Sequence, residues 1–192
     1  DYSRDMAEWA HMVGRMKEPK PSVSIAIVGK YVEMPDAYIS VKEAIRHAAL
    51  YYDRDIDIQW IHSEDVDRMG AESLLKSACG IVVPGGFGPR GIEGMIETAR
   101  YARENDIPYL GLCLGMQVMV VDYARHKLHL TGANSAEIDP STLHPVIDIL
   151  PEQRSLAEMG GTMRLGLYPC SLVKGTRAQE AYAQSEVMER HR

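Results

Sequence analysis

Four short hydrophobic runs, alternating with segments of helical periodicity, constrain the fold of this chain more than any other feature of its sequence. They lie at residues 23–28 (VSIAIV), 56–61 (IDIQWI), 80–86 (GIVVPGG) and 107–112 (IPYLGL). Such runs are typical of buried strands, and strands that alternate with helices along a chain form parallel sheets. The sequence therefore predicts an α/β fold with a mostly parallel sheet covered by helices on both faces.

The segments between these runs carry apolar residues at helical spacing. Ser40 and Glu43 have the spacing of a capping box, in which each side chain binds a backbone N–H at the start of a helix. The residues that then share one helical face are Val41, Ala44, Ile45, Ala48 and Tyr52. Further helices are expected at about 71–77, 91–105 and 114–125.

Beyond residue 126 the pattern weakens. Residues 129–145 are rich in Ser, Thr, Asn and Pro, which is typical of a loop, and a short extended piece is expected at 145–153. Residues 160–173 suggest a hairpin or two short strands. The final MERHR, residues 188–192, has the composition of a charged tail.

The first 22 residues form a segment of their own. Trp9, Met12, Val13 and Met16 make a helical stripe, which the two prolines of residues 17–22 (KEPKPS) then end. Because such a stripe requires a surface to pack on, we expect residues 1–22 to be a helix and linker from a preceding domain. A terminal remnant with an incidental amphipathic turn is the alternative.

Composition narrows the functional classes. The formal net charge of −6 and the scattered basic residues argue against a nucleic-acid surface, which requires clustered Lys and Arg. The uncharged stretch between Asp106 and Asp122 contains a proline and glycines and is too short to cross a bilayer. Cysteines and histidines occur in no metal-ligand spacing, so we expect no metal site and a reduced, cytoplasmic protein. The three cysteines are Cys79, Cys113 and Cys170.

Residues 111–115, Gly-Leu-Cys-Leu-Gly, have the form of a nucleophile elbow. In an elbow a strand turns sharply into a helix, the turning residue is strained and exposed, and flanking side chains would collide with strand and helix. The N-terminus of the helix favours a thiolate, and its N–H groups can stabilise an oxyanion. A structural cysteine in a glycine-flanked turn is the alternative. The predicted strand-to-helix boundary at Cys113 favours a nucleophile.

Residues 84–88, Pro-Gly-Gly-Phe-Gly, follow the third predicted strand. Consecutive glycines let the backbone present N–H groups to an anion, such as an oxyanion or a phosphate. No lysine stands at the spacing of a nucleotide-binding P-loop, so a nucleotide site is disfavoured. A flexible loop remains an equally good interpretation of these five residues.

Taken together, PGGFGPRG and the later PYLGLCLGMQ resemble the class I, or triad, glutamine amidotransferases. Within that family, further segments are similar to the glutaminase domains of CTP synthases, over essentially the whole chain. These segments are IAIVGKYVEMPDAYISVKEAIRHAA, ANSAEIDP, GGTMRLG and VMERHR. The resemblance implies a flavodoxin-like or Rossmann-like sheet of the class I amidotransferase type. Residues 23–192 would form the glutaminase domain.

The resemblance also implies roles for individual residues. Cys113 would attack the side-chain amide of glutamine and form a glutamyl thioester. Backbone N–H groups of Gly86 and Leu114 would form the oxyanion hole, and Glu137 would pair with the amino group of the substrate. A solvated loop acid is the alternative for Glu137. The residues implied to line the glutamine pocket are Leu114, Gly115, Met116 and Gln117.

The implied reaction is hydrolysis of L-glutamine to glutamate and ammonia. The ammonia would pass to a synthase domain of the same polypeptide, which aminates UTP to CTP with ATP and Mg²⁺, in a homotetramer that GTP activates. No cofactor is implied for the glutaminase domain itself. Arg90 lies where the glycine loop could respond to GTP, with a plain surface arginine as the alternative.

One part of the family pattern is missing. The base and its orienting acid lie in a late FHPE-like segment, and His144-Pro145 is the closest match, without the acid. Since triad members act as a unit, we expect a C-terminal truncation and little glutaminase activity from the 192 residues alone. The alternatives are a non-catalytic regulatory or subunit-contact domain, another class I amidotransferase, or a hydrolase of the intracellular protease type.

Overall fold

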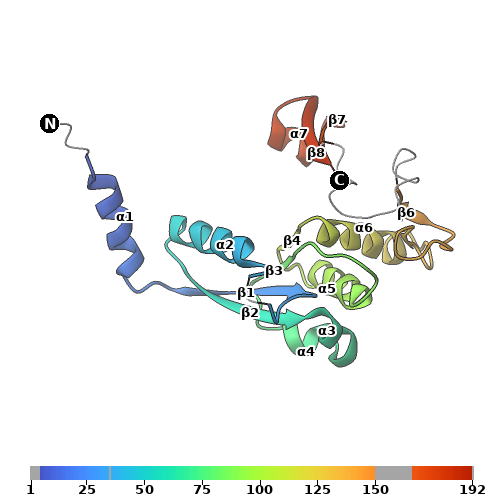
Figure 1. Ribbon diagram of the computed structural model, residues 1–192, viewed down its shortest axis with the longest axis horizontal. Helices are drawn as coiled ribbons and strands as arrows, with labels where there is room; N and C mark the ends of the chain where they lie inside the picture. Colours follow the sequence, from blue (N-terminus) through green and yellow to red (C-terminus); the bar gives the residue numbers. More distant parts are fainter. Residues whose placement is uncertain (1–4, 35, 150–165, 192) are drawn as a thin grey trace. The chain divides into compact units, whose positions relative to one another are not determined.

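The computed structural model describes residues 5–34, 36–149 and 166–191, and the chain divides into two compact units, Asp1–Asp148 and Ile149–Arg192. Figure 1 shows the helices and strands of both units. The first unit opens with α1 (Ala7–Lys17), β1 (Ser22–Gly29), α2 (Ile39–Tyr51), β2 (Asp55–His62), α3 (Ser63–Met69) and α4 (Ala71–Leu75). It continues with β3 (Gly80–Val83), α5 (Ile92–Glu104), β4 (Tyr109–Gly111), α6 (Leu114–His126), β5 (Asn134–Ser135) and β6 (Pro145–Ile147).

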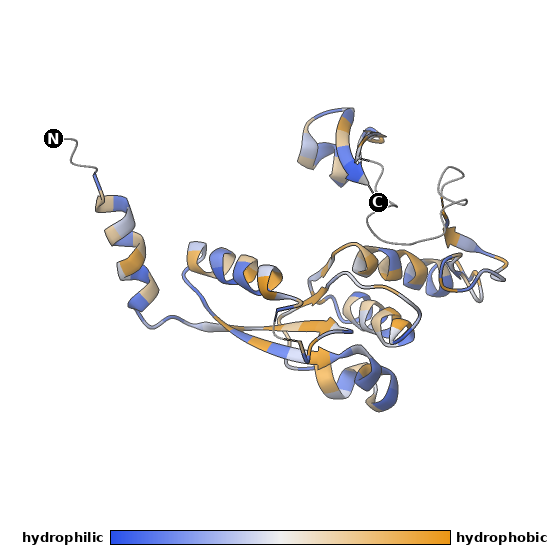
Figure 2. Ribbon diagram, in the orientation of Figure 1, coloured by the Kyte–Doolittle hydropathy of each residue, from blue (hydrophilic) through white to orange (hydrophobic). Residues whose placement is uncertain are grey.

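The centre of the first unit is a parallel sheet in the order β2-β1-β3-β4. The four predicted strands are thus confirmed, and the order is that of a flavodoxin-like sheet. Hydrophobic residues concentrate on the central strands (Figure 2). Because all four strands run the same way, the loops that follow them, at residues 30, 84 and 112, lie along one carboxyl edge.

Helices cover both faces of the sheet, as expected. Ala26 and Val28 of β1 point to a large core formed with α3, α4, α5 and α6. Ile25 and Ile27 alternate to the other face, where they pack with Val41 and Ile45 of α2. The period-two alternation of a strand therefore divides β1 between two cores.

The prediction for the start of α2 is wrong. The helix α2 begins at Ile39, so Ser40 lies inside it and the capping box with Glu43 does not form. The N-cap is Tyr38, whose hydroxyl accepts hydrogen bonds from the N–H groups of residues 30 and 31 (3.1 and 3.2 Å). This anchor to the sheet edge, and not a side-chain cap, sets the start of α2.

The segment between β2 and β3 contains two helices where one was predicted. Residues 71–77 contain only α4, Ala71–Leu75, and the additional helix α3 begins immediately after β2. The ring Nδ1 of His62 accepts a hydrogen bond from the N–H of Glu64 (3.4 Å) and so caps α3. One buried apolar residue, Val66, is too little periodicity for a sequence pattern to predict α3.

The helix α1 forms as predicted and buries none of its residues. Trp9 and Met16 are about 60% exposed, and the helix is attached through Arg15, whose guanidinium binds Asp53 (Nη2–Oδ1 2.6 Å) beyond the end of α2. The alternating hydropathy of α1 is visible in Figure 2. Among the described residues, no helix is long and apolar enough to cross a membrane.

The second unit contains β7 (Gly166–Ser171), α7 (Arg177–Tyr182) and β8 (Glu186–His191). β7 confirms one strand within 160–173, and it pairs antiparallel with β8, so the predicted charged tail is a strand. Residues 160–165 of that prediction lie outside the described residues. A hydrogen bond from the Tyr182 hydroxyl to the Glu189 carboxylate (2.5 Å) ties α7 to β8. This bond spans residues too far apart for a local pattern to indicate.

Candidate functional site

Cys113 lies in the sharp turn between β4 and α6. Its φ of 53° is in the left-handed region, which non-glycine residues rarely adopt, and its thiol is an exposed free cysteine. The N–H groups of Met116 and Gln117 bind the Cys113 carbonyl (3.1 and 3.2 Å) and start the helix. The strained, exposed position at a helix N-terminus is the geometry of a nucleophile elbow.

The two glycines that flank the elbow are required by packing. A Cβ on Gly111 would overlap the backbone of Gly115, and a Cβ on Gly115 would overlap the carbonyl oxygen of Val83 in β3. The N–H of Leu112 donates to that same Val83 carbonyl (2.9 Å). The turn is therefore pressed against β3, as the sequence pattern predicts.

The glycine loop after β3 lies beside Cys113. A Cβ built on Gly85 would be 4.0 Å from the Cys113 Sγ, and one built on Gly86 would be 3.4 Å from Leu114 Cδ2. Within the described part of the chain, neither the N–H of Gly86 nor that of Leu114 has a hydrogen-bond partner. Two available N–H donors thus flank an exposed thiol, which is the arrangement an oxyanion hole requires.

The residues that follow Leu114 form the first turn of α6. Leu114 and Gly115 are buried, Gln117 is half-buried and Met116 is 44% exposed. Because the turn presents its open side to solvent next to the thiol, Met116 and Gln117 are the members of the predicted pocket within reach of a ligand. Leu114 and Gly115 contribute backbone and packing.

Glu137 lies just after β5, where its N–H donates to the Ser135 hydroxyl (3.3 Å). Its carboxylate is close enough to the Lys30 ammonium to oppose the lowering of the pKa of that lysine. Lys30 in turn touches Gly86, since a Cβ on this glycine would be 3.3 Å from Lys30 Cδ. The structure therefore brings Glu137 to the same edge of the sheet as the glycine loop.

Arg90 also belongs to this edge. Its guanidinium donates to the Lys30 carbonyl (2.9 Å) and forms an ion pair with Glu64 (Nη1–Oε2 2.8 Å). The ring Nε2 of His62 is 3.3 Å from the same guanidinium. Arg90 is thus an exposed arginine that is held by the residue after β1, by the end of β2 and by the first turn of α3.

Histidines contribute little to this edge in the described residues. None of them forms a hydrogen bond with Cys113, and His126 binds Asp122 (Nδ1–Oδ1 2.8 Å) at the far end of α6. No group of His, Cys, Asp and Glu in the described residues has an arrangement that could hold a metal ion. At this edge the structure brings together backbone N–H donors, a thiol, a carboxylate and a lysine.

Sequence reasoning missed Lys30 and Tyr31. Both follow β1 directly and contact the glycine loop after β3, and Lys30 is only 2% exposed. A charged residue immediately after a buried strand was the signal, because the carboxyl ends of neighbouring parallel strands meet at one edge.

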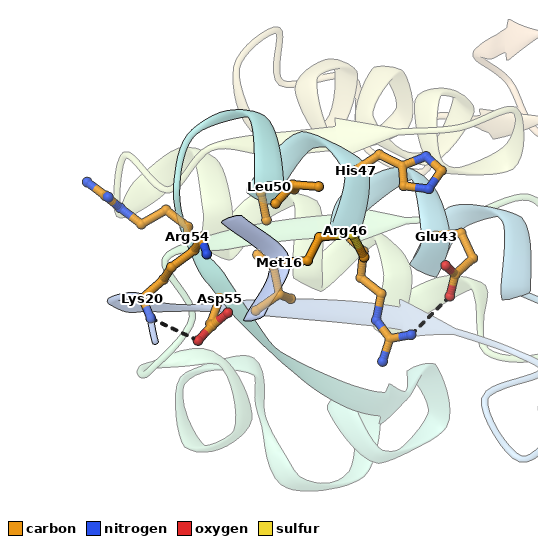
Figure 3. A pocket seen from close by; sticks show the side chains of 10 residues that line it. Met16, Lys20, Glu43, Arg46, His47, Leu50, Arg54 and Asp55 are labelled. Atoms are coloured by element: carbon orange, nitrogen blue, oxygen red, sulfur yellow. Dashed lines mark hydrogen bonds and ion pairs between the residues drawn. The ribbon is translucent and has the colours of Figure 1, made fainter. Parts of the chain in front are cut away.

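A separate cavity of about 430 Å³ lies between α1, α2 and the start of β2 (Figure 3). Both of its carboxylates have a partner: Arg46 binds Glu43 (3.1 Å), and the backbone N–H of Lys20 binds Asp55 (3.3 Å). Asp55 opens β2, so the cavity lies at the amino edge of the sheet. Active sites of parallel sheets lie at the opposite, carboxyl edge, which is where Cys113 is found.

Comparison with known proteins gives consistent matches. The model of the family described as glutamine amidotransferase class-I matches residues 33–192. CTP synthases of Geobacillus kaustophilus and Bacillus licheniformis are 56% and 55% identical over 188 residues, which are 98% of this chain and 35% of each relative. The chain thus spans about one third of the length of these relatives.

A solved structure shares the fold. It is described as the glutaminase domain of Trypanosoma brucei CTPS with bound acivicin, and it is 34% identical with a TM-score of 0.73. The match covers 88% of this chain and 66% of that one.

Proposed function

We propose that this chain, which belongs to the class I glutamine amidotransferase family, supplies the nucleophile for hydrolysis of L-glutamine, through a thioester on Cys113. The observation that carries the proposal is the exposed thiol of Cys113, held at φ 53° at the start of α6 beside two available N–H groups. These groups belong to Gly86 and Leu114. A thiol in a structural turn has no need of a strained backbone or of open donors beside it.

The reaction assigns one role to each group. The Cys113 thiolate attacks the side-chain amide carbon of glutamine, forming a C–S bond while the carbonyl electron pair moves to oxygen. The N–H groups of Gly86 and Leu114 bind this oxyanion. The pair then returns, the C–N bond breaks, and the nitrogen takes up a proton and leaves as ammonia. Water attacks the thioester, releasing glutamate and restoring the thiol.

An electrophilic glutamine analogue tests this function. 6-Diazo-5-oxo-norleucine should alkylate Cys113 with loss of nitrogen gas, and L-glutamine should slow the reaction. Since binding positions the reagent, the rate at Cys113 should exceed that at the exposed Cys79 by about 100-fold or more. Peptide mass spectrometry measures both sites in one sample.

Iodoacetamide, which needs only an accessible thiolate, provides the reference. If iodoacetamide modifies Cys113 while the analogue does not, the thiol has no glutamine pocket and the domain is regulatory or a subunit contact. An analogue reaction that glutamine fails to slow would indicate another hydrolase with the same elbow.

Glu137→Gln tests the pocket acid. We expect the Glu137→Gln chain to bind the analogue about 10- to 100-fold more weakly than the unsubstituted chain does, because the substitution would remove a charge-assisted hydrogen bond to the substrate ammonium. The saturating rate of alkylation should change little. Asp139→Asn is the matched control, because the asparagine oxygen can keep the turn that Asp139 makes with Ser141 (2.6 and 3.0 Å). Equal weakening by both substitutions would assign the effect to the loop instead.

For the longer protein we propose the activity of a CTP synthase. The identity of 56% to CTP synthases across 98% of this chain supports this proposal. Residues 1–22 would lead from the synthase domain and residues 23–192 would belong to the glutaminase domain. The ammonia would aminate UTP in the synthase domain, with ATP and Mg²⁺, and GTP would activate the enzyme. The longer protein would be a cytoplasmic homotetramer. The free thiols Cys79, Cys113 and Cys170 suit a reducing compartment.

A further inference from the structure

Lys30 is a buried charge without a role in the chemistry described so far. Only 2% of the residue is exposed, at the first position after β1. Its ammonium donates to the carbonyl of Phe87 (3.1 Å) and to that of Gly88. A lysine is rarely buried unless it is paired, so these two bonds to the glycine loop define its surroundings.

Tyr31 holds the same loop from the other direction. Its hydroxyl accepts a hydrogen bond from the N–H of Phe87 (3.3 Å), and its ring lies 3.5 Å from the position of a Cβ on Gly86. Phe87 is thus fixed at both its N–H and its carbonyl. Because a peptide unit is planar, the bond to the Phe87 N–H also fixes the Gly86 carbonyl and so limits how the backbone of Gly86, one residue earlier, can turn.

Charges around Lys30 are arranged on three sides. Arg90 donates to the Lys30 carbonyl (2.9 Å), and the carboxylates of Glu64, in the first turn of α3, and of Glu137, just after β5, act on the ammonium. Burial and, next, the Arg90 guanidinium lower the pKa of Lys30 to about 8, while Glu137 and Glu64 oppose this shift. The Lys30 ammonium therefore loses its proton close to neutral pH, at about pH 8.

We propose that Lys30 is a positioning residue for glutamine hydrolysis: its ammonium holds the Phe87 and Gly88 carbonyls so that the Gly86 N–H points toward the oxyanion. The glycines at 85, 86 and 88 leave this loop free to turn, and the two bonds from Lys30 select one orientation. This inference rests on the function proposed for Cys113. It implies that the residues after β1, the strand that pairs with β3, determine the geometry of the oxyanion site.

Lys30→Met tests this role, with Lys76→Met as the control. Methionine keeps the length of the buried stem without the ammonium, and Lys76 is an exposed residue after α4. The quantity measured is the ratio of two rates at Cys113, for 6-diazo-5-oxo-norleucine and for iodoacetamide. The ketone oxygen of the analogue would bind in the oxyanion site. Lys30→Met should lower the ratio about 100-fold, as the loss of one oxyanion donor does, and Lys76→Met should leave it unchanged.

Two further variants separate positioning from folding. Tyr31→Phe removes only the acceptor for the Phe87 N–H and keeps the ring, so it should lower the ratio about 10-fold in a fully folded chain. Lys30→Arg keeps a charged donor and should recover part of the loss. A ratio that is unchanged in Tyr31→Phe and in folded Lys30→Met would overturn the proposal.

The pH dependence of this ratio is a further test, because a purely structural role of Lys30 would not change it. Lys30 is charged below its pKa of about 8, so the ratio should fall as the pH rises through 8. The diazo carbon must also take up a proton before nitrogen leaves, and this demand is the same in every variant, so the contribution of Lys30 is the difference between the pH profiles of the unsubstituted chain and Lys30→Met. Burial raises the pKa of the neighbouring Tyr38, which therefore stays neutral in this range. Lys30→Met should lack the additional fall near pH 8, and so should Lys30→Arg, because arginine remains charged.

The two proposals fail differently. If the analogue does not react with Cys113 in the unsubstituted chain while iodoacetamide does, the glutaminase function fails. If the analogue reacts and glutamine slows it, yet the ratio shows no dependence on Lys30 or on pH near 8, only the positioning role fails.

Discussion

Gly115→Ala is expected to lower the free energy of unfolding by about 3 kcal/mol or more, because overpacking against backbone has no easy relief. The added Cβ would overlap the carbonyl oxygen of Val83 and lie 3.1 Å from the Val83 Cβ. Val83 is fully buried in a central strand, so α6 must move instead. Urea unfolding of the two proteins, followed by circular dichroism, measures the difference.

Gly14→Ala is the matched control. The same chemical change in α1 meets no atom within 4 Å, and alanine in a helix interior is about 0.5–1 kcal/mol more favourable than glycine. Gly14→Ala should therefore leave stability unchanged or raise it. If Gly115→Ala were as well tolerated as Gly14→Ala, the close packing of the elbow on β3 would be wrong.

A Gly115→Ala chain that still folds should also react more slowly with 6-diazo-5-oxo-norleucine at Cys113. Displacing α6 from β3 moves the Leu114 N–H away from the glycine loop, which is anchored separately by Lys30 and Tyr31. The packing that stabilises the elbow and the geometry that makes it reactive therefore depend on the same two glycines, Gly111 and Gly115.

The sequence predicts the parts of this site that rest on local pattern. The turn at Cys113 is readable because a strained strand-to-helix turn admits only glycine on both sides, and this requirement appears as GLCLG. The strands are readable because Ile25, Ala26, Ile27 and Val28 are buried on alternate faces without a break. Burial on both faces leaves a continuous hydrophobic run.

Features that depend on distant residues were missed for a common reason. α2 starts where the Tyr38 hydroxyl meets the end of β1, and β8 is a strand because β7, fifteen or more residues earlier, pairs with it. Lys30 acts on Phe87 from another strand. In each case the partner is set by a tertiary contact, which local periodicity does not encode.

The sheet order also explains why the site forms from short-range elements. β1, β3 and β4 are neighbours, so Lys30, Gly86 and Cys113 follow three adjacent strands. Each strand contributes one function: an anchoring charge, a backbone donor and a thiol. The residues need no long loops to meet, because the parallel register already places the three turns side by side.

Arg103→Leu is expected to lower the free energy of unfolding by about 2 kcal/mol, because the buried Asp122 carboxylate would lose two charge-assisted hydrogen bonds and keep only His126 as a partner among the described residues. The guanidinium binds Asp122 through two bonds (Nε–Oδ2 2.9 Å and Nη2–Oδ1 3.2 Å), and the Asp122 side chain is 2% exposed. The pair joins α5 to α6, the helix that carries Cys113 at its start. Thermal and urea unfolding measure the loss.

The double variant Arg103→Leu/Asp122→Leu and the single variant Arg100→Leu make this prediction specific. Leucine at both positions should recover much of the loss, because no uncompensated charge then remains buried. Arg100 lies on the same helix but pairs with exposed Glu97 and Glu104, so Arg100→Leu should change stability by no more than about 0.5 kcal/mol. Equal losses from Arg100→Leu and Arg103→Leu would show that helix propensity, and not the buried Asp122 carboxylate, determines the effect. A loss confined to Arg103→Leu would show that the contact with the buried Asp122 carboxylate stabilises the packing of α5 on α6.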